Sequence, residues 1–408
     1  MEVRTLSPEE AVEYLKMCNV CFAMPNKHYE KWQDDLKKYG EDCENKLGGF
    51  DDCGKLVAGL YMIPYTMNFD GHSVKMGGIQ AVVTLPESRG SGVMSNIMPE
   101  CLRIMKEKGQ IFSVLYPFSF AYYRKFGYEA AYERRWAEIP INFFCKYPYP
   151  KTPVRFWEKG HSLSDIGSVY DTFKAHRNYA LDREGDAMRW GQEGVRRGWN
   201  ELLKDDPYIT KRYTYTHYNS QGRPDSYIVF DAREPGHTDM KIVELAWAAK
   251  DGLFDMFGFI GGLRPQFDTV HWEVPDDLDL SSLFPEANEI KYAIEPSAMT
   301  RIVDLPEVLK RLRPPSISNG NVVIEVADKS FPCNTGKYGI AWSNGKIAVS
   351  TTGQAPDMTT TIEAMAQMVT GYLSPEKAAY RPDTTIYSRH EALAALFYKK
   401  NLYLWERF

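Results

Sequence analysis

Residues 79–94, IQAVVTLPESRGSGVM, decide the fold, because they join an apolar strand pattern to a glycine turn and then to a helical pattern. The strand pattern ends at Thr84, and residues 89–92, RGSG, lead directly into a helix predicted over residues 92–108. Glycine has no Cβ, so it lets backbone N–H groups turn inward, and a helix N-terminus adds a partial positive charge. The combination can bind a pyrophosphate, although plain strand-to-helix connections often carry a short glycine turn as well.

Two other phosphate-binding loops are excluded at this position. No Gly-Lys-Ser/Thr follows the turn, which rules out a P-loop, and the spacing is not Gly-x-Gly-x-x-Gly. A Ser-His-Asp hydrolase is also unsupported, because the chain contains no Gly-x-Ser-x-Gly elbow.

The residues before this stretch predict a mixed helix and strand region. Ser7 precedes an acidic, amphipathic run and is a candidate helix N-cap, and a second helical pattern covers residues 29–39. Residues 56–69 and 74–84 are typical of two strands, joined by a turn at Asp70-Gly71-His72.

The middle of the chain repeats the order of the opening part. A strand pattern at residues 241–248 precedes a helical pattern at residues 251–263, the same order as residues 79–108, so an internal duplication is possible. Its turn, AKDG at residues 249–252, lacks the arginine and the glycine pair, and Asp251 would repel a phosphate. We interpret this second unit as structural.

The last part of the chain predicts an α+β region. After a connection rich in proline, aspartate and serine, residues 302–312 favour a short helix. Residues 338–342 and 346–351 predict a hairpin, because Asn344-Gly345 between them is a strong turn signal.

Composition limits the class of protein. Hydrophobic residues make up 44% of the 408 and charged residues 25%, as in a folded globular chain. The net charge of −5 argues against broad binding to nucleic acid or to an anionic membrane. The longest uncharged stretch, which contains residues 111–123, is too short to span a bilayer, and the acidic start does not resemble a signal peptide. We therefore expect a cytoplasmic protein with no membrane partner.

The seven cysteines leave two interpretations open for the early pair Cys18 and Cys21. Their spacing suits a zinc site, but no second Cys-x-x-Cys or histidine pair follows. The alternative, which we favour, is that both lie on the buried stripe of a helix. No histidine has a metal-ligand partner at useful spacing, so no metal is expected.

The glycine turn resembles the pyrophosphate loop of the GNAT acetyltransferase superfamily, Arg/Gln-x-x-Gly-x-Gly/Ala after a strand. Arg89, Gly92 and Met94 occupy those positions, and Gly90 is the frequent second residue. Met94 departs from the small final residue of most members. In the superfamily, the strand before the loop offers free backbone groups to the pantetheine arm of acetyl-CoA.

Residues 118–128, FSFAYYRKFGY, make the resemblance more specific, because the superfamily often has a tyrosine near the cofactor sulfur followed by a Phe-Gly-Tyr/Phe turn. With this length and three-part order, the chain is similar to the enhanced intracellular survival (Eis) family, in which a large residue at the Met94 position also occurs. That resemblance implies an α/β (α+β) fold with tandem GNAT-like domains and a C-terminal sterol-carrier-protein-like domain. We place them at residues 1–145, 146–290 and 291–408.

The resemblance also implies the site. Tyr123 would protonate the leaving thiolate, and the C-terminal carboxylate of Phe408 would act as the base. Trp32 is a weak candidate for the substrate pocket. The residues implied to bind acetyl-CoA are Val82, Val83, Thr84, Arg89, Gly90, Ser91, Gly92, Val93, Met94, Ser95, Phe118 and Ser119.

The ending LYLWERF is aromatic to its last residue, whereas most chain ends are polar and fray. Burial of Trp405 and Phe408 could dock this terminus, and simple hydrophobic packing is the alternative to a chemical role. By resemblance, we expect a homo-hexameric, acetyl-CoA-dependent N-acetyltransferase that acts on a small primary amine (an aminoglycoside, a polyamine or a lysine-like group) by direct attack. The alternative is a non-catalytic CoA- or lipid-binding regulator.

Overall fold

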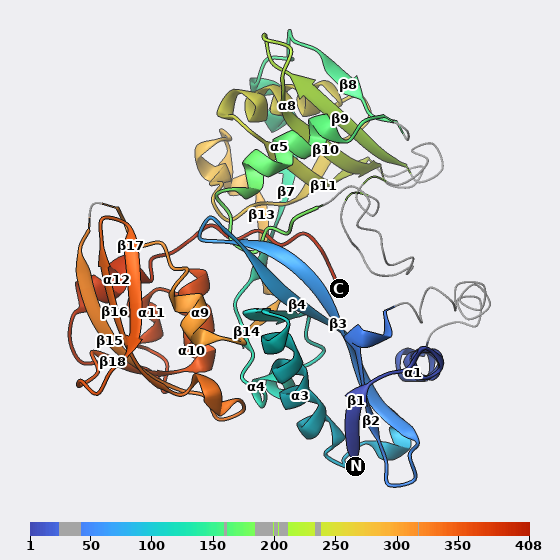
Figure 1. Ribbon diagram of the computed structural model, residues 1–408. Helices are drawn as coiled ribbons and strands as arrows, with labels where there is room; N and C mark the ends of the chain where they lie inside the picture. Colours follow the sequence, from blue (N-terminus) through green and yellow to red (C-terminus); the bar gives the residue numbers. More distant parts are fainter. Residues whose placement is uncertain are drawn as a thin grey trace.

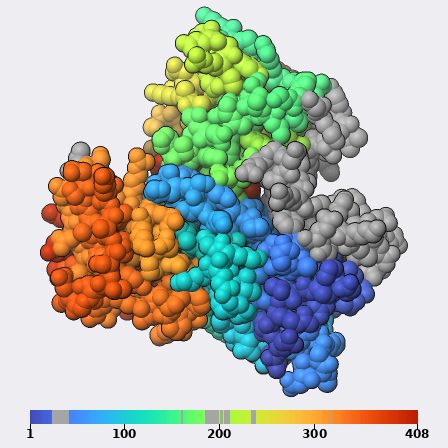
Figure 2. Space-filling model, viewed as in Figure 1, coloured from blue at the N-terminus to red at the C-terminus, as the bar shows by residue number. Residues whose placement is uncertain are grey.

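The computed structural model describes residues 1–23, 42–158, 161–183, 199, 203, 211–232, 238–316 and 318–408. Three β-sheets organise them (Figure 1): one in the centre, one above it in green and yellow, and one on the left in orange. Figure 2 shows the orange group packed directly against the blue and cyan residues of the central group, with the green group above. The mixed α/β fold predicted from the sequence is confirmed.

The central sheet carries the glycine turn. Its strands, in spatial order, are β1 (Glu2–Thr5), β2 (Lys46–Phe50), β3 (Leu56–Phe69), β4 (His72–Thr84), β5 (Phe112–Leu115), β14 (Met299–Ile302) and β6 (Glu129–Ala130). The hairpin of β3 and β4 turns at Asp70 and Gly71, as the sequence predicts, and both residues have positive φ.

Two helices cover opposite faces of the central sheet. Adjacent strand residues point to opposite faces, and a Cβ on Gly49 would meet Ile97 of α3 (Val93–Glu107), whereas one on Gly48 would meet Leu6, just before α1 (Pro8–Phe22). Ser7 caps α1 as predicted. Cys18 is buried in α1 against the sheet and Cys21 donates to the Thr84 carbonyl, which agrees with the helix-stripe interpretation of this pair.

The second sheet repeats the same plan. Its strands, in spatial order, are β13 (Lys291–Pro296), β7 (Glu133–Pro140), β12 (Thr269–Glu273), β11 (Asp239–Trp247), β10 (Pro224–Ala232), β9 (Arg212–Tyr218) and β8 (Val154–Phe156). The helices α5 (Ser164–Lys174) and α8 (Lys250–Gly262) pack on it. The strand-then-helix order predicted at residues 241–263 is therefore confirmed, as β11 followed by α8.

The two sheets exchange strands through one long antiparallel ribbon. β6 and β7 form one arm of the ribbon and β13 and β14 form the other, with a constant register from Lys291 opposite Glu138 to Thr300 opposite Glu129. Between the two halves, Ser297 N donates to Tyr132 O at 2.9 Å, which keeps the ribbon continuous. As a result β14 lies inside the central sheet and β7 inside the second sheet. Domain limits at residues 145 and 290 stay a prediction.

The third sheet forms the C-terminal region together with short helices. Its strands, in spatial order, are β17 (Lys346–Thr351), β16 (Gly336–Ser343), β15 (Gly320–Ala327), β18 (Met358–Thr361) and β19 (Thr385–Ile386), with helices α9 (Leu305–Leu309), α10 (Ile362–Thr370), α11 (Pro375–Ala378) and α12 (His390–Leu396). The predicted hairpin over Asn344-Gly345 is present, and both residues have positive φ, as a two-residue turn of this type requires.

The helix expected at residues 302–312 is shorter than predicted. Ile302 ends β14, and α9 begins only after Asp304, whose side chain accepts from Glu307 N as an N-cap. The C-terminal region shares one hydrophobic core with the central sheet, including Met67 and Phe69 of β3 and Leu305 of α9. Of the helices in the described ranges, none combines the length and the apolar character that a membrane span needs.

Candidate active site

The glycine turn connects β4 to α3 in the way the sequence predicts. After Thr84 the chain makes a short 3₁₀ turn at Pro86–Ser88 and then passes through Gly90 and Gly92, with φ of 82° and 79°. Residues with a Cβ rarely adopt these angles, so both positions favour glycine. Gly92 is the N-cap of α3 and no neighbour lies within 4 Å of where its Cβ would be, so the helix N-terminus faces open space.

A cleft of about 780 Å³ opens at this turn. The structure brings every predicted cofactor residue except Ser119 to its wall. Ser119 lies just beyond, where it caps the short helix α4 (Phe120–Arg124) and accepts from Tyr122 N at 3.3 Å. The lining residues are Cys21, Phe22, Val82, Val83, Thr84, Ser88, Arg89, Gly90, Ser91, Gly92, Val93, Met94, Ser95, Phe118, Tyr122, Lys125 and Phe126.

The cleft has the charge that a pyrophosphate needs. Arg89 and Lys125 line it, while Arg124 pairs with Glu129 at 2.8 Å. The backbone N–H groups in the first turn of α3 add to this positive field, because they have no partner within the helix. The residues that line the cleft fit a cofactor whose pyrophosphate binds at the glycine turn and whose pantetheine arm lies along β4. Sequence reasoning did not select Lys125, although it lies within the quoted 118–128 string.

Tyr122 and Tyr123 have different positions. Tyr122 lines the cleft, whereas Tyr123 lies behind it, only 2% exposed, with its ring against Phe118, Tyr122 and Tyr128. Burial raises the pKa of the Tyr123 phenol well above its ordinary value, so the hydroxyl keeps its proton at neutral pH. Among the described residues that hydroxyl has no hydrogen-bond partner, and it is not one of the fully enclosed unpaired atoms.

Phe408 docks on the central sheet. In Figure 1 the chain end, in red, crosses from the third sheet to the neighbourhood of β3 and β4. The Phe408 ring is 8% exposed and lies 5.0 Å from the Tyr65 ring and 5.4 Å from the Tyr116 ring. A Cβ on Gly78 of β4 would come within 2.9 Å of it, so this strand has glycine where the terminus approaches.

Phe408 does not line the cleft itself. It lies against Gly78, just before Ile79, where β4 parts from β5 and runs on toward the cleft. Sequence reasoning missed Tyr65, Tyr116 and Gly78, because nothing in their local pattern shows that a terminus more than 290 residues away packs on them. Trp32 lies outside the described residues.

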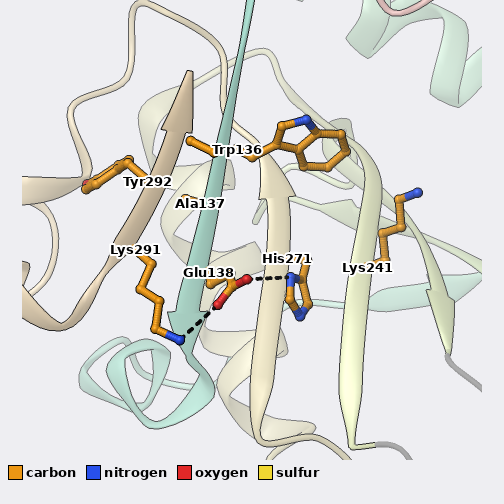
Figure 3. A pocket seen from close by; sticks show the side chains of 8 residues that line it. Trp136, Ala137, Glu138, Lys241, His271, Lys291 and Tyr292 are labelled. Atoms are coloured by element: carbon orange, nitrogen blue, oxygen red, sulfur yellow. Dashed lines mark hydrogen bonds and ion pairs between the residues drawn. The ribbon is translucent and has the colours of Figure 1, made fainter. Parts of the chain in front are cut away.

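A second cleft, of about 320 Å³, lies on the second sheet (Figure 3). Glu138 of β7 lies between two basic side chains there: its carboxylate is 3.2 Å from Lys291 Nζ and 3.9 Å from His271 Nδ1. His271 Nε2 is also 3.6 Å from Asp239. These side chains contact one another, and the cleft has no glycine turn, so we assign no chemistry to it. Within the described ranges, no group of His, Cys, Asp and Glu side chains could hold a metal ion.

Family models match the three regions in the same order. Two models of the acetyltransferase (GNAT) domain match residues 2–131 and 195–302. A model of the sterol carrier protein domain matches residues 305–405. The internal duplication considered from the sequence is therefore a pair of GNAT domains. No curated protein matches the chain significantly.

Solved structures share the whole-chain fold. A GCN5-related N-acetyltransferase from Anabaena variabilis has a TM-score of 0.81 at 23% identity, with 100% of both chains covered. A conserved protein from Enterococcus faecalis has a TM-score of 0.84 at 22% identity, over 100% of this chain and 99% of that one. Eis1 from Mycobacterium abscessus has a TM-score of 0.78 at 17% identity, again over 100% of both chains. The chain thus carries two acetyltransferase (GNAT) domains followed by a sterol carrier protein domain, and it shares this whole-chain fold with Eis1.

Proposed function

We propose that the chain transfers the acetyl group of acetyl-CoA to a primary amine at the cleft of the first GNAT domain. The observation that carries this proposal is the junction of β4, the positive-φ glycines Gly90 and Gly92, and α3, open to a cleft with two cations. The pyrophosphate would lie on the N-terminus of α3, and the pantetheine arm would follow Val82, Val83 and Thr84.

The chemistry is a direct transfer without a covalent enzyme intermediate. The neutral amine attacks the thioester carbonyl carbon, the C–N bond forms and the C–S bond breaks. Tyr123, which is protonated at neutral pH, donates its phenolic proton as the thiolate departs, and the phenolate then regains a proton from water. The nitrogen loses a proton through water to the Phe408 carboxylate, and the products are an amide and CoA.

The role of the Phe408 carboxylate rests on its docking. The Phe408 ring packs on Tyr65 and Tyr116, and partial desolvation beside such aromatic walls would make the terminal carboxylate a better base. A short Gly-Ser tail appended after Phe408 keeps the ring and moves the carboxylate away. Turnover should fall at least a hundredfold while acetyl-CoA affinity and oligomer size stay unchanged. Full activity of the extended chain would show that the terminus is structural only.

The charge near the terminus favours amines with few charges. Arg407 lies 3.6 Å from Glu273, and Arg134 occupies the same carboxylate at 2.6 Å, so two guanidinium groups share one anion beside Phe408. The Arg407 guanidinium next to the terminus would repel a polycation. We therefore expect lysine-like and monoamine substrates to be used better than polyamines or aminoglycosides.

The test is thiol release from acetyl-CoA, followed with dithionitrobenzoate over a panel of polyamines, aminoglycosides and lysine peptides. Amine-dependent release, with the acetylated amine seen by mass spectrometry, is expected. Gly92→Val should abolish it, because a β-branched residue is strained at φ 79° and its side chain would block the amide groups. Gly109→Val is the matched control, since Gly109 also has positive φ and open space but lies at the other end of α3. Binding of acetyl-CoA with no turnover on any amine would favour the non-catalytic regulator.

We also propose that the enzyme is a cytoplasmic homo-hexamer. What supports assembly is the edge strand β13, all of whose residues are exposed, including Tyr292 and Ile294 at 48% and 53%. An exposed edge strand with apolar side chains favours pairing with another chain. Light scattering of the purified protein should give the mass of six chains; a monomer would contradict the assembly.

A further inference from the structure

The second GNAT domain reproduces the strand geometry that opens the cofactor cleft in the first. β4 pairs in parallel with β5 only as far as Ile79, and from there to Thr84 it is paired with β3 on its other side only. β11 pairs in parallel with β12 only as far as Ile242, and from there to Trp247 it is paired with β10 on its other side only. In both sheets the neighbouring antiparallel strand has an irregular register just beyond this point.

In the second domain, residues near the chain's own C-terminus lie beside the part of β11 that is no longer paired with β12. Tyr403, Leu404 and Trp405 lie beside Val243, Glu244 and Leu245 of β11, and the space left between them is about 10 Å³, against about 780 Å³ for the cleft of the first domain. Trp405 Nε1 donates to Val243 O at 2.8 Å. A side chain of the tail therefore satisfies a carbonyl on the part of β11 that lacks β12 as a partner, where a buried unpaired group would be costly.

A buried charged cluster secures the same segment. Arg183 donates to both oxygens of Glu244 at 2.8 Å and to Glu406 Oε1 at 2.6 Å, and all three side chains are at most 1% exposed. Tyr227 donates to Glu244 at 2.5 Å, and the Tyr403 hydroxyl donates to the other oxygen of Glu244. Because removing one partner would leave a buried charge uncompensated, the cluster resists any displacement of the tail.

The anchored residues immediately precede the terminus. Tyr116 of the first domain donates to Glu406 O at 2.7 Å, and its ring contacts Phe408. Trp405 is thus held by the second domain, Glu406 by both domains, and Phe408 by the first. Only a few bonds separate Trp405 from the Phe408 carboxylate, so a shift of the Trp405 backbone moves the carboxylate as well.

We propose that the second GNAT domain has kept its acyl-CoA cleft as a receptor for the chain's own C-terminus, with Trp405 as the positioning residue that sets where the Phe408 carboxylate meets the amine. The proposal rests on the proposed function, in which that carboxylate is the base. It also predicts that this GNAT domain binds no acetyl-CoA, because the tail fills the space beside β11 beyond the end of its pairing with β12.

The test replaces Trp405 with Phe, which keeps an aromatic ring and removes the indole N–H. The matched control is Trp342→Phe in the third sheet, where an indole also donates one hydrogen bond, to Ser318 Oγ at 3.1 Å. We expect kcat of Trp405→Phe to fall about tenfold, with KM for acetyl-CoA and the thermal midpoint changed no more than in the control. The decrease in kcat should become smaller as the pH rises toward the pKa of the substrate amine, about 10.4 for a lysine side chain. At high pH, hydroxide and water can remove the proton from the amine, so the misplaced Phe408 carboxylate is needed less.

Trp405→Phe is also made in the Gly-Ser-extended chain. This variant separates the claim that the Phe408 carboxylate is the base from the claim that Trp405 positions it. If the terminus acts through its carboxylate, extension lowers turnover at least a hundredfold, and Trp405→Phe then adds no further loss to the residual rate. An extended chain with full activity would refute the carboxylate role and, with it, this proposal. If extension lowers turnover but Trp405→Phe in the unextended chain has normal kcat, or a loss that does not depend on pH, the receptor proposal alone is overturned.

Discussion

At the scale of single residues, the two adjacent tyrosines Tyr122 and Tyr123 show how position decides chemistry. Tyr122 lines the cleft and Tyr123 is enclosed by aromatic rings. Burial raises the pKa of both phenols, and it raises that of Tyr123 further, to a value at which the group is protonated throughout the neutral range. A proton donor in catalysis must be protonated before the reaction, and both phenols meet that condition.

Tyr123→Phe keeps the ring and removes the proton. Turnover should fall roughly 10²–10⁴-fold with acetyl-CoA affinity intact, as expected for lost acid catalysis. Tyr122→Phe is the matched control and should change turnover less than tenfold. Steady-state kinetics on both variants decide the assignment: the reverse ranking would make Tyr122 the acid, and normal turnover in both would remove a tyrosine from the mechanism.

The roles of several single residues could be predicted from the sequence. Gly90, Gly92 and Ser7 act through their own backbone or through neighbours a few residues away, so a local pattern reveals them. Tyr65, Tyr116 and Gly78 could not be predicted, because their role depends on a terminus that reaches them only in the folded chain. The positioning of Phe408 likewise depends on Arg183 and Glu244, which no motif identifies.

At the scale of elements, the ribbon of β6–β7 and β13–β14 contradicts a simple reading of the chain as consecutive blocks. The central sheet contains β14, which follows the second GNAT domain's other strands in the sequence, and the second sheet contains β7, which directly follows β6 of the central sheet. Sequence patterns predict strands from local alternation, whereas the order of strands in a sheet depends on tertiary contacts, so β11, α8 and the 338–351 hairpin were predictable and this exchange was not.

A chain of residues 1–145 alone should therefore fail to fold. Without Met299–Ile302 the central sheet lacks its strand between β5 and β6, and every residue of that strand is buried. We expect no cooperative thermal transition by circular dichroism and no acetyl-CoA binding, while the full chain shows both. A cooperative, acetyl-CoA-binding fragment would show that the exchange is dispensable and would support a domain limit at residue 145.

The N-terminus of α1 gives a prediction about pH. The Glu10 side chain accepts from Arg4 at 2.6 Å and from Ser7 N at 2.8 Å, and these bonds, that from Arg4 above all, lower its pKa from 4.5 to about 2. A lowered folded-state pKa stabilises the fold above pH 4.5, and the contribution is lost as the pH falls toward 2.

Glu10→Gln should lower the thermal midpoint at pH 7 by about 3 °C, the effect of a lost capping interaction of about 1 kcal/mol. The difference from the native chain should narrow as the pH falls from 4.5 toward 2, because the native carboxylate becomes protonated. Glu13→Gln is the control, since Glu13 pairs with Lys16 on the same helix but is 60% exposed. A midpoint difference independent of pH would contradict the role of the Glu10 charge.

At the scale of the whole molecule, the C-terminal segment connects all three domains. The first GNAT domain has the open cleft, the second holds Tyr403–Trp405 in the corresponding place, and the segment reaches them from the third domain. Lys400 fixes the start of this tail on the β3–β4 turn, where its ammonium pairs with Asp70 at 2.5 Å. The two GNAT domains thus share a fold but differ at this place: the first has an open cleft, and the second holds the chain's own C-terminal segment.

The most direct test of this account is calorimetric titration of the full-length protein with acetyl-CoA. We expect one binding site per chain, because only the first GNAT domain has the open glycine cradle, and we expect no binding by Gly92→Val, whereas Gly109→Val binds normally. Two sites per chain would show that the tail does not block the second domain. One site that survives in Gly92→Val would place acetyl-CoA outside the first domain's cleft and contradict the account.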